Sequence, residues 1–152
     1  MANTVESLID DSLFDDLNFE LTVRGFCSDQ GWTIDDVGSG YARLVFSMSS
    51  GRRQTLWISR YGSTLEFSVP SALAYDDEDA VPGSLSTALL KLNAKNKIGF
   101  WCIEEIDSKY VFSYMHNAEI QLVNSQYFAR VVKAVLQQCD IVDGAAAAAF
   151  GS

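Results

Sequence analysis

Few residues of this chain carry the side chains that catalysis by a nucleophile and a base requires. The sequence has one histidine, His116, and three widely separated cysteines, Cys27, Cys102 and Cys139. Covalent catalysis needs a serine or cysteine beside a base, so a pairing of His116 with Cys27 or Cys102 is open from the sequence alone. No GxSxG motif accompanies the histidine, and we expect a surface histidine at a strand end. We therefore predict no catalytic residues.

The acidic residues and glycines also lack the spacing of known sites. Residues 76–79 are all acidic, but calcium loops alternate ligands with spacers and need a glycine turn, so a solvated loop is expected. Glu104 and Glu105 are neighbours in a predicted strand and should point to opposite faces, which prevents them from serving one bond. The glycines at 38 and 40 lack the spacing and lysine of a phosphate loop. We predict no metal and no cofactor.

The cysteine pattern and the N-terminus indicate a reducing compartment. The cysteines are odd in number, form no CxxC motif and lie in apolar patterns, as expected for buried reduced thiols. The segment MANTVESLIDDSLFDD lacks the basic start and apolar run of a signal peptide. No uncharged apolar stretch approaches the ~18 residues of a membrane helix. We expect a cytoplasmic protein without a membrane partner.

The negative charge is concentrated near the N-terminus. The net charge is −9; residues 1–40 hold nine acids against one arginine, which gives −8, and the remaining residues hold eleven acids against ten bases. A phosphate backbone would be repelled by the first segment, so nucleic-acid binding is not expected. The acidic segment could steer a basic protein partner or could serve solubility alone.

Hydrophobic periodicity predicts an α+β fold with the order helix, three strands, helix, two strands, helix. The expected elements are a helix over 13–28, strands over 41–48, 54–60 and 65–69, a helix from 84, strands over 100–106 and 110–115, and a helix over 125–139. The strands should form an antiparallel sheet with the helices packed on it. We predict a single domain over residues 13–143, an acidic, loosely ordered segment over 1–12 and an alanine-rich tail over 144–152.

The clearest unit lies between residues 84 and 107. An apolar stripe at helical spacing ends at Leu92 and Asn93, and Gly99 precedes the predicted hairpin. Asn93 could bond free carbonyls at the helix end or adopt a positive φ, and Gly99 permits a turn that is barred to other residues. Both roles are structural.

This order of elements, the acidic charge and the segment from Leu92–Asn93 to Gly99 resemble the YbjN-like family, with Cys139–Asp140 at the end of the final helix as a further point of likeness. These proteins are also called bacterial sensory transduction regulators, and their fold is similar to that of type III secretion chaperones. The resemblance covers residues from about 13 to 142. It implies no catalytic residues; it implies protein binding, often as a dimer.

The resulting prediction is a non-enzymatic protein-binding module, chaperone-like or regulatory, that forms a homodimer. By similarity, the candidate dimer residues are Leu85, Leu89, Trp101 and Ile103, and the candidate partner contacts are Leu44, Phe46, Leu56 and Trp57. Each could instead be a core residue. Trp57 is the exception, because strand alternation places it opposite Leu56 and an aromatic on the second face of a sheet needs a cover. The alternative function is a small-molecule-binding sensor or enzyme with an apolar pocket.

Overall fold

The computed structural model describes the backbone of residues 5–150 and the side chains of residues 18–150. Within this range it has three α-helices, α1 (Val5–Gln30), α2 (Gly83–Lys95) and α3 (Ser125–Phe150). Its strands are β1 (Asp36–Gly38), β2 (Tyr41–Ser47), β3 (Arg53–Tyr61), β4 (Thr64–Tyr75), β5 (Phe100–Ile106) and β6 (Lys109–Glu119), with short 3-10 turns η1 (Glu78–Ala80) and η2 (Ile120–Leu122). The predicted α+β class and element order are confirmed.

The six strands form one antiparallel sheet in the order β1-β2-β3-β4-β6-β5. The sequence predicts a turn over residues 35–40, whereas Asp36–Gly38 pairs with the start of β2 as a short edge strand. Gly40 makes the tight connection between these two strands at φ +76°. The small size of β1 explains why no alternating pattern marks it in the sequence.

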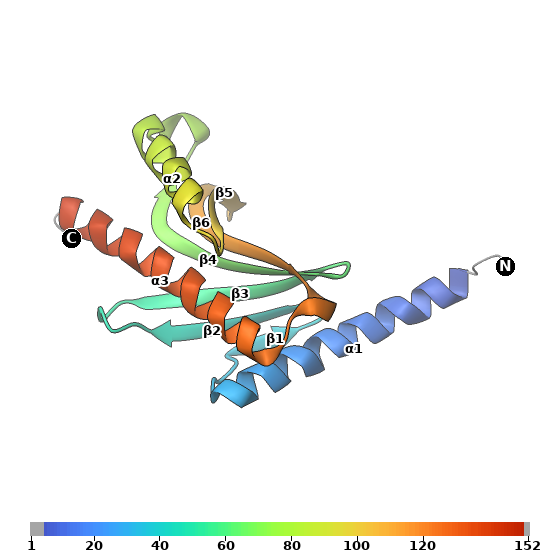
Figure 1. The fold of residues 1–152 in the computed structure, drawn as a ribbon. Coiled ribbons are helices and arrows are strands. Elements are labelled where there is room, and N and C mark those ends of the chain that lie inside the picture. The colour runs from blue at the N-terminus through green and yellow to red at the C-terminus, as the bar shows by residue number, and fades with distance from the viewer. Residues whose placement is uncertain (1–4, 151–152) are drawn as a thin grey trace.

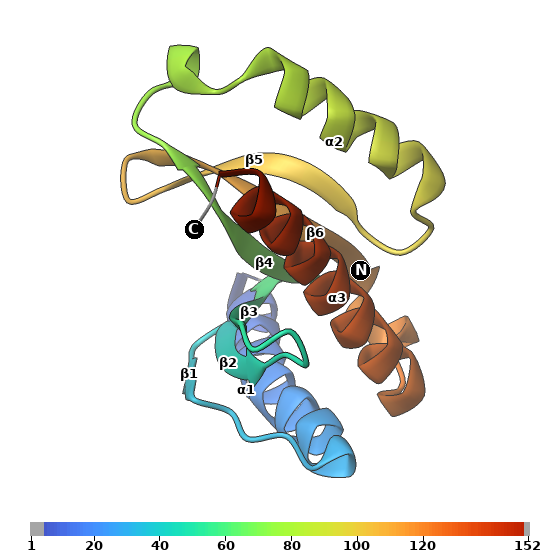
Figure 2. The same ribbon diagram turned by 90° about the vertical axis from the view of Figure 1, so that its left-hand side faces the viewer.

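All three helices pack on one face of the sheet. The register places Leu44 opposite Leu56 and Ile58 opposite Phe67 on this face, where all four side chains are fully buried. Phe128 of α3 joins them, and its ring also contacts Phe26 of α1, with the ring centroids 4.9 Å apart. Figure 2 shows α2 beside β5 at one end of the sheet and α1 at the other, with α3 between them.

The segment between α2 and β5 is fixed by Asn93 and Gly99. The Asn93 Oδ1 accepts from the Trp101 backbone N–H at 2.6 Å, and its Nδ2 donates to the Trp101 carbonyl at 3.1 Å. Neither predicted role of Asn93 at the helix end is correct, because its amide bonds the β5 backbone instead. Gly99 has φ +84°, and a Cβ there would meet the Tyr114 ring and lie 2.9 Å from the Met115 carbonyl oxygen. Only glycine fits this turn.

The first and last helices are longer than the apolar stripes that predict them. Helix α3 continues through the alanine run to Phe150, because alanine has the highest helix propensity, so residues 144–150 are part of this helix. Helix α1 begins at Val5 and its first half extends past the sheet (Figure 1). The looser order predicted for residues 1–12 stays a prediction.

Candidate functional site

The second face of the sheet is not covered by any helix of the described residues. Strand alternation directs Trp57, Glu66, Ser68, Glu104 and Val111 to this side, away from the core residues of the same strands. We call it the open face. A trough of about 400 Å³ lies on it, and all five of these residues line it. The trough crosses β3, β4, β6 and β5, so it exists only when these strands are paired.

Aromatic side chains stand at the β3 side of the trough. The Trp57 side chain is 37% exposed and the Tyr61 side chain 62% exposed. The Arg43 guanidinium lies 5.9 Å from the centre of the Trp57 ring, and the Tyr41 ring centroid lies 6.3 Å from it. Exposed aromatic clusters of this kind are enriched at protein interfaces.

Two carboxylates give the trough its charge. The Ser68 hydroxyl donates to Glu104 Oε1 at 2.7 Å, and because β6 lies between their strands this hydrogen bond spans β6. Burial raises the pKa of Glu66, and the nearby charge of Glu104 raises it further. Burial likewise raises the pKa of Cys102 to about 12, with added contributions from Glu104 and Glu66. None of the ion pairs formed by the described residues involves Glu66 or Glu104. The trough is therefore acidic.

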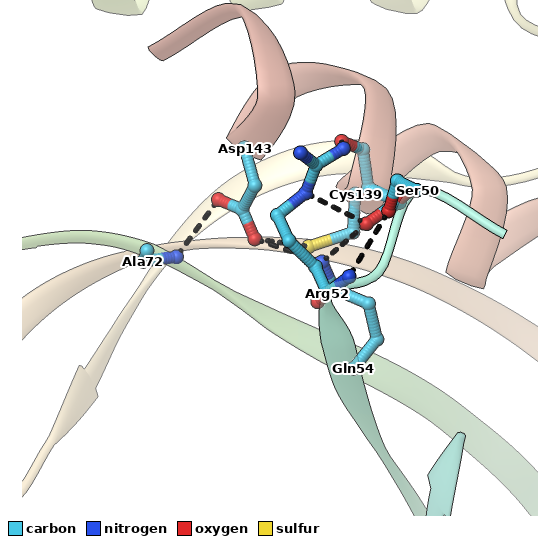
Figure 3. Close-up of polar contacts among 7 residues, drawn as sticks. Ser50, Arg52, Gln54, Ala72, Cys139 and Asp143 are labelled. Atoms are coloured by element: carbon cyan, nitrogen blue, oxygen red, sulfur yellow. Dashed lines mark hydrogen bonds and ion pairs between the residues drawn. The ribbon is translucent and has the colours of Figure 1, made fainter. Parts of the chain in front are cut away.

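Helix α3 holds the shape of the trough through Asp143. Its Oδ1 accepts from the Ala72 backbone N–H at 2.9 Å, and Oδ2 accepts from Gln54 Nε2 at 3.0 Å (Figure 3). Ala72 lies in the irregular part of β4 between Pro70 and Ala74, where the register with β6 shifts. Because Pro70 and Ala74 both line the trough, Asp143 fixes one of its walls from the opposite side of the sheet.

Asp140 anchors the β2–β3 turn to the same helix. Arg52 donates to the Asp140 carboxylate at 3.0 Å and to its backbone carbonyl at 2.9 Å, and Gln54 donates to the carboxylate at 3.2 Å. Burial acts to raise the pKa of Asp140, but hydrogen bonds from Ser50, Gln54 and Arg52 and the Arg52 charge outweigh it and lower the pKa. Cys139 is buried beside Asp143, and burial raises the pKa of its thiol. The Cys139–Asp140 pair is thus structural.

His116 lies within β6 and is not the surface histidine that the sequence predicts. Its Nδ1 accepts from the Gly99 backbone N–H at 3.1 Å, and its Nε2 lies 2.9 Å from the Tyr127 hydroxyl. Burial lowers its pKa. Burial also raises the pKa of Cys27 to about 11. Among the described side chains no cysteine or serine is hydrogen-bonded to this imidazole, and no group of His, Cys, Asp and Glu is arranged to hold a metal ion.

The predicted partner contacts divide between the core and the open face. Leu44 and Leu56 are fully buried, and Phe46 is partly buried in a T-shaped contact with Trp32, 5.4 Å between ring centroids. These three serve the core, because α1 and α3 cover the face that carries them. Trp57 lies on the open face, as strand alternation predicts.

The predicted dimer residues lie between α2 and β5. Leu89 and Trp101 are buried, Leu85 is partly buried against the core, and Ile103 is 45% exposed. Leu89, Trp101 and Ile103, together with the exposed Leu90, line an apolar pocket of about 180 Å³, which is smaller than the roughly 300 Å³ at which ligand pockets begin. Their part in a dimer stays a prediction. The acidic side chains at 10, 11, 15 and 16 lie outside the side chains that the structure describes.

Sequence reasoning missed Glu66, Ser68 and Tyr61 as site residues. The prediction that Glu104 and Glu105 point to opposite faces is correct, so these two do not form a pair. The actual companion of Glu104, Glu66, is two strands away in the sheet, on β4. The spacing of residues in the sequence does not indicate that β6 lies between β4 and β5. The pairing of the strands is therefore needed to see that Glu66 and Glu104 are close.

Comparison with known proteins supports the fold. No protein-family model matches the chain, and no curated protein matches it. The chain is similar to the crystal structure of YbjN from E. coli, described as a candidate transcription regulator, with 19% sequence identity, a TM-score of 0.60, and coverage of 85% of this chain and 91% of that chain. This likeness shows a YbjN-like fold. No helix among the described residues is long and apolar enough to cross a membrane.

Proposed function

We propose that this protein is a non-enzymatic, protein-binding regulatory or chaperone-like module that holds a segment of another protein on the open face of its sheet. The observation that carries the proposal is the uncovered face itself, with Trp57 and Tyr61 exposed beside a trough. Contiguous exposed apolar and aromatic surface marks interaction sites in folded proteins. A cytoplasmic location is part of the same proposal.

Two further features support a protein partner over a nucleic acid or a substrate. The net charge of −9 and the acidic trough oppose a phosphate backbone. The similar structure of YbjN is described as a candidate regulator, which favours a regulatory over an enzymatic role. Regulation would then act through contacts with other proteins.

We also propose that the protein forms a homodimer through the apolar surface between α2 and β5. Leu90 is 64% exposed on α2, and Ile103 is exposed on the adjacent strand. Two-fold interfaces bury a self-complementary apolar patch, and this patch lies away from the trough, so both surfaces could be used at once.

Photo-crosslinking from position 57 tests the proposed function. A benzoylphenylalanine replaces Trp57 in the protein expressed in its native cell, and the same residue replaces Leu122 as the control, because Leu122 is 80% exposed on η2. We expect the crosslinker at position 57 to give a discrete adduct with another protein. The crosslinker at position 122 should give no adduct of the same mass. Identical adducts from both positions, or none from position 57, would contradict the proposal.

A further inference from the structure

We infer that the trough on the open face recognises an arginine or lysine side chain of a peptide segment of the partner, with the cationic group bound between Glu66 and Glu104 and its aliphatic stem against Trp57. This inference rests on the proposed function, since it requires a partner on the open face. It adds to that function the chemical feature by which a partner would be recognised, a basic side chain.

Charge complementarity is the first argument. Glu66 and Glu104 line one trough, and no lysine or arginine of the described residues forms an ion pair with either. Alternation places Arg43, Arg53 and Lys109 on this face as well, but none of them lines the trough, and Arg43 lies over Trp57. The nearby charge of Glu104 disfavours the ionised form of Glu66. A cation between the two carboxylates would offset this unfavourable charge interaction.

The walls of the trough fit the rest of a basic side chain and its neighbours. The Arg43 guanidinium lies over the Trp57 ring, and the same Trp57 side chain lines the trough, where it offers apolar surface to an aliphatic stem. Ile106 and Val111 continue the lining beyond the carboxylates as an apolar strip. Apolar residues that flank the arginine or lysine would lie on this strip, so a peptide gains contacts that a free cation does not.

Peptide binding followed by nuclear magnetic resonance tests the inference. Four pools of seven-residue peptides carry Arg, Lys, citrulline or Glu at the centre and randomised residues elsewhere, and each pool is added to the labelled protein. We expect the Arg and Lys pools to shift the resonances of Trp57, Glu66 and Glu104, and the citrulline and Glu pools to leave them unchanged. The best single Arg peptide is then titrated into the variants Glu66→Gln and Glu104→Gln. Each should bind about tenfold more weakly, the effect of one charge-assisted hydrogen bond.

Glu105→Gln is the matched control, because Glu105 follows Glu104 in β5 but points to the opposite face and is exposed. Its affinity should equal that of the wild type. Equal binding of the citrulline pool, or unchanged affinity in both trough variants, would overturn the inference, while a discrete adduct from position 57 would still support the proposed function. Spermidine binding as tightly as the peptide would contradict a peptide ligand. Trough resonances that shift with protein concentration alone would identify a second copy of the chain as the occupant and overturn the inference.

Discussion

Replacing Asp143 with alanine should lower the free energy of unfolding by about 3 kcal/mol. The Asp143 carboxylate accepts hydrogen bonds from the Ala72 N–H and from Gln54 Nε2, and Asp143 and Gln54 are both buried. A hydrogen bond to a charged group contributes about 1.5–3 kcal/mol, so the two together contribute at least about 3 kcal/mol. Alanine returns up to about 0.7 kcal/mol through its higher helix propensity. Loss of the Ala72 bond should also loosen the irregular part of β4.

Urea unfolding of Asp143→Ala, Asp143→Asn and wild type measures this effect. Asparagine keeps an acceptor for the Ala72 N–H but presents an amide donor to Gln54, so its loss should be about half that of alanine. Asp29→Ala, at an exposed position of α1, should stay within about 0.5 kcal/mol of wild type. Hydrogen exchange at the Ala72 amide should accelerate most in Asp143→Ala. An alanine variant as stable as wild type, or an asparagine variant less stable than alanine, would refute the role of this carboxylate.

Four further predictions concern the other elements. Asn93→Ala should destabilise the protein by about 2 kcal/mol in urea unfolding, because two hydrogen bonds to the Trp101 backbone are lost; a change below about 0.5 kcal/mol would contradict this. Light scattering across concentration should show a dimer for the wild type and a monomer for Ile103→Asp, whereas a wild type that stays monomeric at tens of micromolar, in the range of ordinary dimer affinities, would exclude the dimer. Replacing Cys27, Cys102 or Cys139 singly by alanine should leave partner binding intact, since burial raises the pKa of all three thiols and disfavours the reactive thiolate. Changing Asp10, Asp11, Asp15 and Asp16 to Asn should slow association with a basic partner and leave dissociation unchanged, and an unaltered association rate would reduce this segment to a solubility role.

The sequence predicts the helices and strands of this fold better than it predicts which of them pack against each other. Alternation along β3 is enough to place Trp57 on the face opposite Leu56, because the two-residue period depends on local geometry alone. The same reasoning cannot tell whether Leu44 faces a partner or the core, since that depends on which face α3 covers. Leu89 and Trp101 are buried for a similar reason, because α2 packs against β5 and neither pattern alone shows that these two elements meet.

The polar contacts were still harder to predict, because they join residues far apart in the chain. Arg52 meets Asp140, and Ser68 meets Glu104, only after the long connections between them have closed. His116 was expected at a strand end because the apolar pattern stops at Met115, yet the strand continues to Glu119. The strand continues because β6 stays paired with β4 past this point, with His116 opposite Phe67.

The amide of Asn93 has a consequence for how this protein avoids self-assembly into fibrils. A sheet edge with free backbone groups can recruit strands from other molecules. Here one edge strand, β1, is only three residues long. The other, β5, has both outward-facing groups of Trp101 occupied by Asn93, so a foreign strand cannot pair there in register. The sheet can therefore expose one whole face to a partner while its two edge strands stay poorly suited to pairing with strands of other molecules.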